Sequence, residues 1–453
     1  MSVAKRQSDG LVFLVLGIAI FVLFGAALRF TASDSMADFR WLYNGARSLF
    51  AHVDPYNPND FSQFQRRQIQ ERVVREHSIE PVTTNLPPIF LFAAPFARLP
   101  FGVASGLWMA LTGLCLALAS ILIWKETVDY APTISGVLIG FLIANGAILL
   151  GNGNAAGLVA GLCVIAVWCL LNERFAPAAL VCFAVSLVMK PHDGVWVWSY
   201  FLLAGGIHRK RAFQVAVLAF LFCVPAVFWV TRNAPTWTRE LKSNLATTVS
   251  RGEESDPGPS GPTTTKRAME EIIDLQAAVS IFRDEPSVYN SASYLICGAC
   301  LILWSIRTVK PDPKSAPHQR PWFALAAVAP LTLLVTYHRA YDSRILLLTV
   351  PACAMLWARP GKLGRIAALL SVAAFLSTGE IPLAILNHLT KEFQASVTSL
   401  GGWIETIAIM RPGSIVLLAM AFFYLWVYLR PAEGDPERIA LKEAAESLPG
   451  AAR

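Results

Sequence analysis

Long apolar segments separated by short polar connections run along most of the chain. A membrane-crossing helix needs roughly 20 apolar residues, and fewer when neighbouring helices bury it. The segments that meet this requirement are residues 11–30, 101–124, 133–150, 155–171, 175–190, 193–207, 212–231, 289–306, 321–337, 344–358, 364–386 and 413–430. The pattern predicts an all-α polytopic membrane protein with about 12 transmembrane helices.

Lysine and arginine are shared unevenly among the connections. With a cytoplasmic N-terminus, the basic residues fall in alternate connections, at 5–6, 125, 174, 209–211, 307–320, 359–365 and 430. Such an excess marks the cytoplasmic side of membrane proteins. The long connections are then outer loops, namely a first outer loop (31–100), a second outer loop (232–288) and residues 387–412. Residues 1–430 form one integral membrane domain in this scheme, and residues 431–453 form a charged cytoplasmic tail.

The first outer loop begins with an amphipathic stretch, residues 33–58. Its apolar residues recur at helical spacing and share one face; they are Phe39, Leu42, Tyr43, Ala46, Leu49 and Phe50. Arg40, Asn44 and Arg47 fall on the other face. We expect this helix to lie along the membrane surface with its apolar face down.

Three further outer-loop elements are expected. A basic, Gln-rich helix covers residues 63–77, and the proline-broken apolar segment 83–100 dips into the bilayer without crossing it. In the second outer loop, residues 251–266 are rich in Gly, Pro, Ser and Thr, which predicts a mobile segment. It serves either as a flap over a site or as a passive linker. A helix over 267–282 then lies back on the surface.

Composition supports a membrane protein, since 55% of the 453 residues are hydrophobic and 15% are charged, against about 25% charged in soluble domains. The net charge of +7 is accounted for by the cytoplasmic loops, so no nucleic-acid partner is predicted. All eight cysteines lie in apolar segments, and we expect no disulfide. The first apolar segment has no small-residue cleavage site and is expected to be a retained span.

Ionisable residues at span boundaries are functional candidates because burying them is costly. Asp38 follows the first span and is either a general base or a helix cap. His338 lies in the charged turn YHRAYDSR (337–344); it either pairs with Asp38 or a substrate hydroxyl, or bonds a backbone carbonyl. Lys190 ends an apolar run and either binds a lipid phosphate or snorkels to the interface. The amides of Asn152 and Asn154 either bind sugar hydroxyls or form a tight turn.

The chain lacks the short motifs of several common sites. The first outer loop has no Asp-x-Asp or Glu-x-Asp pair, and the chain has no HExxH, Walker A or GxSxG motif. We therefore predict no metal, no cofactor and no ATP-driven pump.

The motifs together resemble glycosyltransferase family 87. They are D-x4-Y and DPY after the first span, a Pro-Pro segment ending PFARLP, GNGNAAGL, an apolar run ending Lys190-Pro191, and YHRAYD, in this order over residues 11–358. The resemblance implies a GT-C fold membrane glycosyltransferase in which Asp38 is the general base and His338 works with it. It places the substrates among further residues, which are Lys190, Tyr43, Asn85, Asn152, Asn154, His192, Arg339, Tyr341 and Arg344.

This resemblance predicts a metal-independent, inverting hexosyltransferase that moves mannose, the favoured sugar, from a polyprenyl-phosphate donor. The acceptor would be an envelope glycolipid or glycan, and the site would face outward from a bacterial inner (plasma) membrane. Lys190 would stabilise the departing lipid phosphate. One alternative is a polytopic transporter or lipid flippase, which would show ionisable residues near mid-span and paired halves. Another is a polymerase or ligase of lipid-linked glycans, which would transfer an oligosaccharide.

Overall fold

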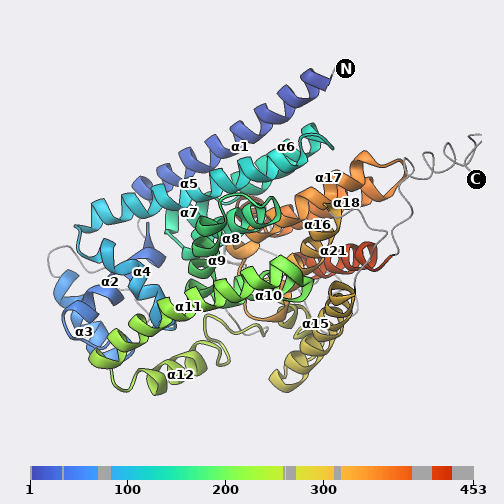
Figure 1. The fold of residues 1–453 in the computed structure, drawn as a ribbon. Coiled ribbons are helices and arrows are strands. Elements are labelled where there is room, and N and C mark those ends of the chain that lie inside the picture. The colour runs from blue at the N-terminus through green and yellow to red at the C-terminus, as the bar shows by residue number, and fades with distance from the viewer. Residues whose placement is uncertain are drawn as a thin grey trace, which may run out of the picture.

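The computed structural model is all-helical in the residues that it describes, which are 3–32, 35–69, 83–258, 261, 272–310, 318–389 and 411–430 (Figure 1). Its helices are α1 (Val3–Thr31), α2 (Ala37–Phe50), α3 (Pro58–Ile69), α4 (Pro87–Ala97), α5 (Phe101–Thr127), α6 (Pro132–Ala144), α7 (Ala147–Asn152), α8 (Ala155–Leu171), α9 (Ala176–Met189), α10 (Pro191–Ala204), α11 (Gly206–Asn233), α12 (Trp237–Thr248), α14 (Leu275–Val279), α15 (Pro286–Val309), α16 (Gln319–Val335), the 3-10 helix η1 (Ala340–Thr349), α17 (Val350–Ala358), α18 (Leu363–Ser377), α19 (Glu380–Leu389) and α21 (Pro412–Leu429).

The protein is an integral membrane protein. Within the described residues, five helices are long and apolar enough to cross a membrane, and they are α1, α5, α11, α15 and α21. Six shorter apolar helices accompany them: α4, α6, α8, α9, α16 and α18. Helices thus occupy all twelve of the apolar segments predicted from the sequence.

Three of the predicted spans are not continuous helices. Segment 133–150 breaks at Asn145-Gly146 between α6 and α7, and segment 364–386 breaks at Thr378-Gly379 between α18 and α19. Segment 344–358 begins as η1 and becomes α-helical only at Val350. The breaks lie together, because buried Arg344 donates to the carbonyls of Leu142 and Thr378 (3.3 Å for Thr378).

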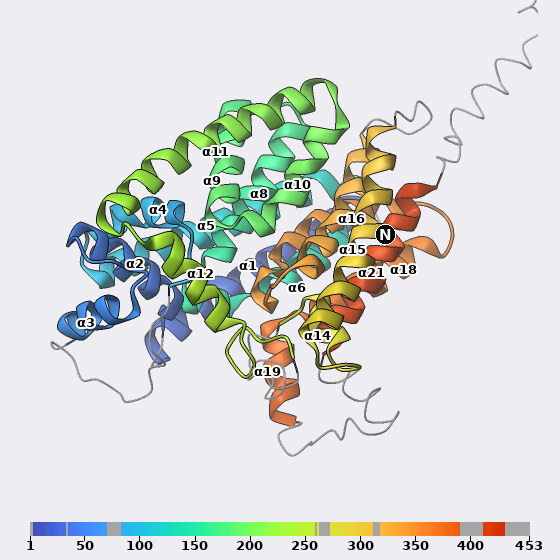
Figure 2. The same ribbon diagram turned by 90° about the horizontal axis from the view of Figure 1, so that it is seen from below.

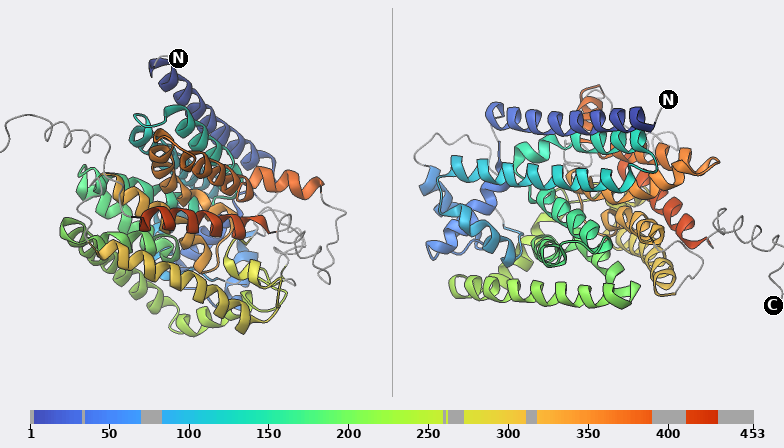
Figure 3. Two further views of the ribbon diagram at one scale, coloured as in Figure 1. Left: turned by 90° about the vertical axis from the view of Figure 1, so that its right-hand side faces the viewer. Right: turned by 45° about the horizontal axis from the view of Figure 1, so that its top comes forward.

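The helices are arranged with the loop elements gathered at one end. α1 packs along α6, and α5 packs along α8 (Figure 3). α2, α3 and α4 gather where α1 ends and α5 begins (Figure 1). Seen from below, they lie across the molecule from α15, α18 and α21, with α12 between the two groups (Figure 2).

α2 corrects the expectation of a helix resting on lipid. Its face packs on protein, since Phe39 lies 4.9 Å from Trp108 and 6.1 Å from Phe101 between ring centroids. Phe50, assigned to the apolar face, is 39% exposed, whereas Asn44 on the predicted polar face is buried. Aromatic rings from α4 and α5 therefore cover the face that sequence periodicity assigned to the membrane.

The other outer-loop elements differ from expectation in extent. The predicted helix over 63–77 is represented by α3, which begins at Pro58; residues 70–82 lie outside the described residues. The segment 83–100 contains one helix, α4, which continues through Pro95. Pro95 therefore does not break this segment, contrary to the prediction.

The second outer loop is more buried than predicted. Of the helix expected over 267–282, the described part contains only α14, and it does not lie on the surface: Ile272, Ile273 and Leu275 are almost fully buried. Ile272 forms an antiparallel bridge with Arg339, and the Ile273 N–H donates to the His338 carbonyl at 3.0 Å. The mobile segment expected over 251–266 lies partly outside the described residues, as do most of 387–412 and the whole of 431–453. The eight cysteines are free thiols.

Candidate active site

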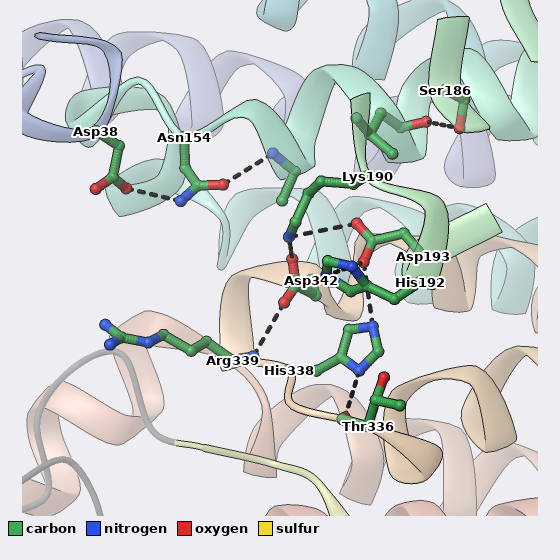
Figure 4. A network of polar contacts seen from close by, with 12 residues as sticks. Asp38, Asn154, Ser186, Lys190, His192, Asp193, Thr336, His338, Arg339 and Asp342 are labelled. Atoms are coloured by element: carbon green, nitrogen blue, oxygen red, sulfur yellow. Dashed lines mark hydrogen bonds and ion pairs between the residues drawn. The ribbon is translucent and has the colours of Figure 1, made fainter. Parts of the chain in front are cut away.

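Asp38 lies at the start of α2 against the turn formed by residues 151–154. The Asn154 side-chain amide donates to Asp38 Oδ2 at 2.7 Å (Figure 4). The other end of the same amide, Asn154 Oδ1, accepts the N–H of Ala156 at 2.8 Å and so caps α8. Because both ends of the Asn154 side chain are engaged, its amide holds the Asp38 carboxylate in one orientation.

The turn itself is fixed by backbone contacts. Gly151 O accepts the Met36 N–H at 2.8 Å, and Gly153 O accepts the Trp108 indole N–H at 2.8 Å. Gly153 has φ +69°, and a Cβ there would lie 2.7 Å from Met36 Cε and from Phe39 Cβ. Glycine is therefore required both by the backbone conformation and by the close approach of α2.

Lys190 occupies the break between α9 and α10, where it ends one helix and precedes the next. Its ammonium forms a short ion pair with Asp342 and lies 3.4 Å from Asp193 Oδ2. It also faces the Tyr341 ring at 5.5 Å. With a side chain only 17% exposed, Lys190 is held inside the protein by two carboxylates and does not snorkel to an interface.

His338 pairs with Asp193, and none of its hydrogen bonds reaches Asp38. His338 Nε2 lies 3.1 Å from Asp193 Oδ1, and Nδ1 lies 2.8 Å from the Thr336 carbonyl oxygen. Burial alone would lower the pKa of His338, but the hydrogen bond to Asp193 and the charges of Asp193 and Asp342 outweigh it and raise that pKa. His192 adds a third group, with Nε2 3.4 Å from the same Asp193 oxygen.

Asp193 and Asp342 are the residues that sequence reasoning missed. Both are almost fully buried, and Figure 4 shows them between Lys190 and His338. Asp342 Oδ2 also accepts the Arg339 N–H at 3.0 Å. The signal for Asp193 was its i,i+3 spacing from Lys190, and the signal for Asp342 was the charge density of its turn. Neither signal identifies the residues, distant in sequence, that each carboxylate contacts in the folded protein.

Tyr341 lies against Lys190. Its ring faces the Lys190 ammonium. Burial raises the pKa of Tyr341 well above its ordinary value, and the charges of Asp342 and Asp38 raise it further. Arg339, next in the same segment, pairs with Glu254 of the second outer loop at 2.9 Å.

Two predicted substrate-binding residues have structural contacts, and a third lies at a helix end. The Tyr43 hydroxyl donates to the Leu99 carbonyl at 2.7 Å, and the Tyr43 side chain is buried. The Asn85 carbonyl accepts from the Tyr56 hydroxyl at 2.9 Å. Asn152 ends α7 and is half-buried.

Arg344 was also predicted to bind substrate, but its side chain donates hydrogen bonds to backbone groups where the helices break. Besides its two carbonyl contacts, it donates to Ser343 Oγ at 2.9 Å. Glu380 completes this junction: its carboxylate accepts the N–H of Ile148 at 2.7 Å and that of Leu149 at 3.1 Å. Residues from three broken segments thus secure α7, which ends in the turn that holds Asp38.

Comparison with known proteins gives one family match. The model of glycosyltransferase family 87 matches residues 84–269. The matched range contains Asn154, Lys190, His192 and Asp193, whereas Asp38 and the segment 338–342 lie on either side of it. No curated protein and no solved structure gives a significant match.

Proposed function

We propose that this membrane protein is a glycosyltransferase, because the model of glycosyltransferase family 87 matches residues 84–269. In this proposal it transfers a hexose, with mannose favoured, from a polyprenyl-phosphate donor. The acceptor is an envelope glycolipid or glycan. The reaction takes place at the outer face of a bacterial inner membrane, in a GT-C architecture with about 12 crossings. The alternating basic connections support this orientation.

The observation that carries the proposal is the Asp38 carboxylate, which the Asn154 amide holds at 2.7 Å. In the proposed step, an acceptor hydroxyl oxygen attacks the anomeric carbon as the bond from that carbon to the phosphate oxygen breaks. Asp38 takes the hydroxyl proton, and the phosphate leaves with the bonding electron pair. One displacement inverts the anomeric centre. Asp38 is half-buried, so an acceptor can reach a carboxylate that protein contacts already orient.

Lys190 suits the departing lipid phosphate. Its ammonium has three N–H donors, and the contacts to Asp342 and Asp193 direct two of them. We assign the third to a phosphate oxygen, where positive charge stabilises the leaving group as it develops. His338 acts on this side of the site, through Asp193.

The test is a transfer assay with purified protein in lipid, radiolabelled polyprenyl-phosphate mannose and a membrane-lipid extract from the host. Asp38→Asn should lower turnover by about 10²–10⁴-fold, the usual contribution of a general base, while donor binding and thermal unfolding stay near wild type. Asp60→Asn, an exposed carboxylate in the same loop, is the matched control and should keep full turnover.

Two results would contradict the proposal. Wild-type turnover in Asp38→Asn would show that Asp38 is not the general base. Absence of transfer by the wild type from mannose, glucose and arabinose lipid donors would show that the donor is not a polyprenyl-phosphate sugar of this kind.

A further inference from the structure

We infer that His192, Asp193 and His338 form a binding site for one divalent cation of the zinc type. Each residue offers one ligand atom, and the three atoms lie within 4.8 Å of one another. Asp193 Oδ1 is the centre of the group, 3.4 Å from His192 Nε2 and 3.1 Å from His338 Nε2. Asp193 is adjacent to His192 but lies 145 positions from His338 in the sequence, so a short sequence motif cannot identify the site.

The spacing fits tetrahedral zinc. Zinc binds histidine nitrogen and carboxylate oxygen at about 2.0–2.2 Å, so two ligand atoms in a tetrahedral site lie about 3.4 Å apart. The two measured separations from Asp193 Oδ1 are close to that value. The rings of His192 and His338 meet edge to face with centroids 4.9 Å apart, and the ligand atoms of the two histidines lie within 4.8 Å of each other.

The hydrogen bond of His338 supports the same conclusion. Its Nδ1 faces the Thr336 carbonyl oxygen, which can only accept, so Nδ1 carries a hydrogen. Metal-bound histidines usually donate their second ring N–H to a carbonyl in this way. This contact leaves Nε2 as the atom of His338 that faces Asp193 Oδ1, at 3.1 Å.

Burial and access favour the cation. His338 is fully buried and Asp193 is 3% exposed, so these two ligands are rigid. The side chain of His192 is 38% exposed and opens the group on one side. Three protein ligands with an open fourth position are the arrangement of catalytic zinc sites. Asp193 Oδ2 contacts Lys190, so the open position borders the ammonium that we assign to the lipid phosphate.

The ligand at the fourth position is a phosphate oxygen of the sugar donor, or water when no donor is bound. This assignment rests on the proposed function, whereas cation binding by the three residues does not. The cation would add to the positive charge of Lys190 where the leaving group becomes more negative.

The experiment measures metal directly. Protein freed of any affinity tag and of metal by chelation is titrated with Zn²⁺ by calorimetry, and with Co²⁺ by visible absorption. We expect about one ion per chain, with the intense d–d bands of tetrahedral Co²⁺, and a higher midpoint of thermal unfolding in Zn²⁺ than in chelator. His192→Gln should weaken binding at least tenfold. His318→Gln, a histidine with an exposed side chain elsewhere, should leave it unchanged.

His192→Gln is the primary variant. Because the His192 side chain is partly exposed, this variant should still fold. His338→Gln is the second variant. Binding below one ion per chain, or equal binding by wild type and both variants, would overturn the inference and leave His338 as the protonated partner of Asp193. The two proposals fail separately. Stoichiometric Zn²⁺ binding without sugar transfer would contradict only the proposed function, and Asp38-dependent transfer without specific metal binding would contradict only this inference.

Discussion

The two sides of the candidate site are built differently. On one side, the half-buried Asp38 is oriented by the neutral amide of Asn154. On the other, Lys190 and His338 are held by Asp193 and Asp342, which are almost fully buried. A base must accept a proton from a substrate, so it needs access. A region that receives phosphate charge needs fixed charges, and buried charges persist only when each is compensated.

This difference predicts different consequences of mutation. The Lys190 side is a set of interdependent buried charges, so removing one member leaves another uncompensated. The Asp38 side depends on an uncharged donor, so changes there should affect turnover more than stability. The three substitutions below test this distinction, from the largest expected effect to the smallest.

Lys190→Met should destabilise the protein by about 3–5 kcal/mol, because Asp193 and Asp342 are then left buried without their cation. The free energy of unfolding in detergent measures the loss. Adding Asp342→Asn should restore much of it, since the second substitution removes one uncompensated charge. Lys210→Met, at an exposed lysine of α11, is the control. Stability equal to wild type in Lys190→Met would show that the two sides of the site do not differ in this way.

Asn154→Ser should lower kcat by about tenfold to a hundredfold, because a misplaced catalytic group costs up to about a hundredfold in rate. Serine still caps α8, but its short side chain cannot reach Asp38, and the lost hydrogen bond lowers stability by no more than about 1.5–3 kcal/mol. Steady-state kinetics beside thermal unfolding separates the two effects. A large loss of stability with kcat preserved would mean that Asn154 supports the fold and does not orient the base.

Tyr43→Phe should cost about 1–2 kcal/mol of unfolding free energy, the net value of two hydrogen bonds. The Tyr43 hydroxyl donates to the Leu99 carbonyl and accepts from Arg47 Nη1 at 3.3 Å. Turnover and KM should remain near wild type. If KM instead rises tenfold at unchanged stability, Tyr43 contacts substrate, as the family resemblance implies.

The helices were predictable from sequence because apolar composition alone determines where a span can form. The breaks were not. Asn145, Thr378 and Gly379 sit inside otherwise apolar windows, where averaging hides them. The breaks are tolerated because Arg344 and Glu380, which are distant in sequence, form hydrogen bonds with the backbone groups that the breaks leave without a partner inside a helix. The burial of α2 was missed for a related reason, because periodicity identifies an apolar face but not what covers it.

For the candidate site, the sequence identified side chains that are expensive to bury, such as Asp38, Lys190 and His338, and predicted that they lie on one side of the membrane. It could not assign their partners. The Asn154 contact to Asp38 joins residues 116 positions apart, and the Lys190 contact to Asp342 joins residues 152 positions apart. Pairing at such distances depends on how helices pack, which the residue pattern does not encode locally.

The Glu380 carboxylate also bears on how the protein is made. A chain is synthesised and begins to fold from its N-terminal end. Glu380 accepts from an N–H 232 positions earlier, at the start of α7, and α7 ends in the turn that holds Asp38. That turn is therefore synthesised long before the contact that secures its helix. A chain released before residue 380 would contain every residue of the candidate site and still lack the finished support for Asp38.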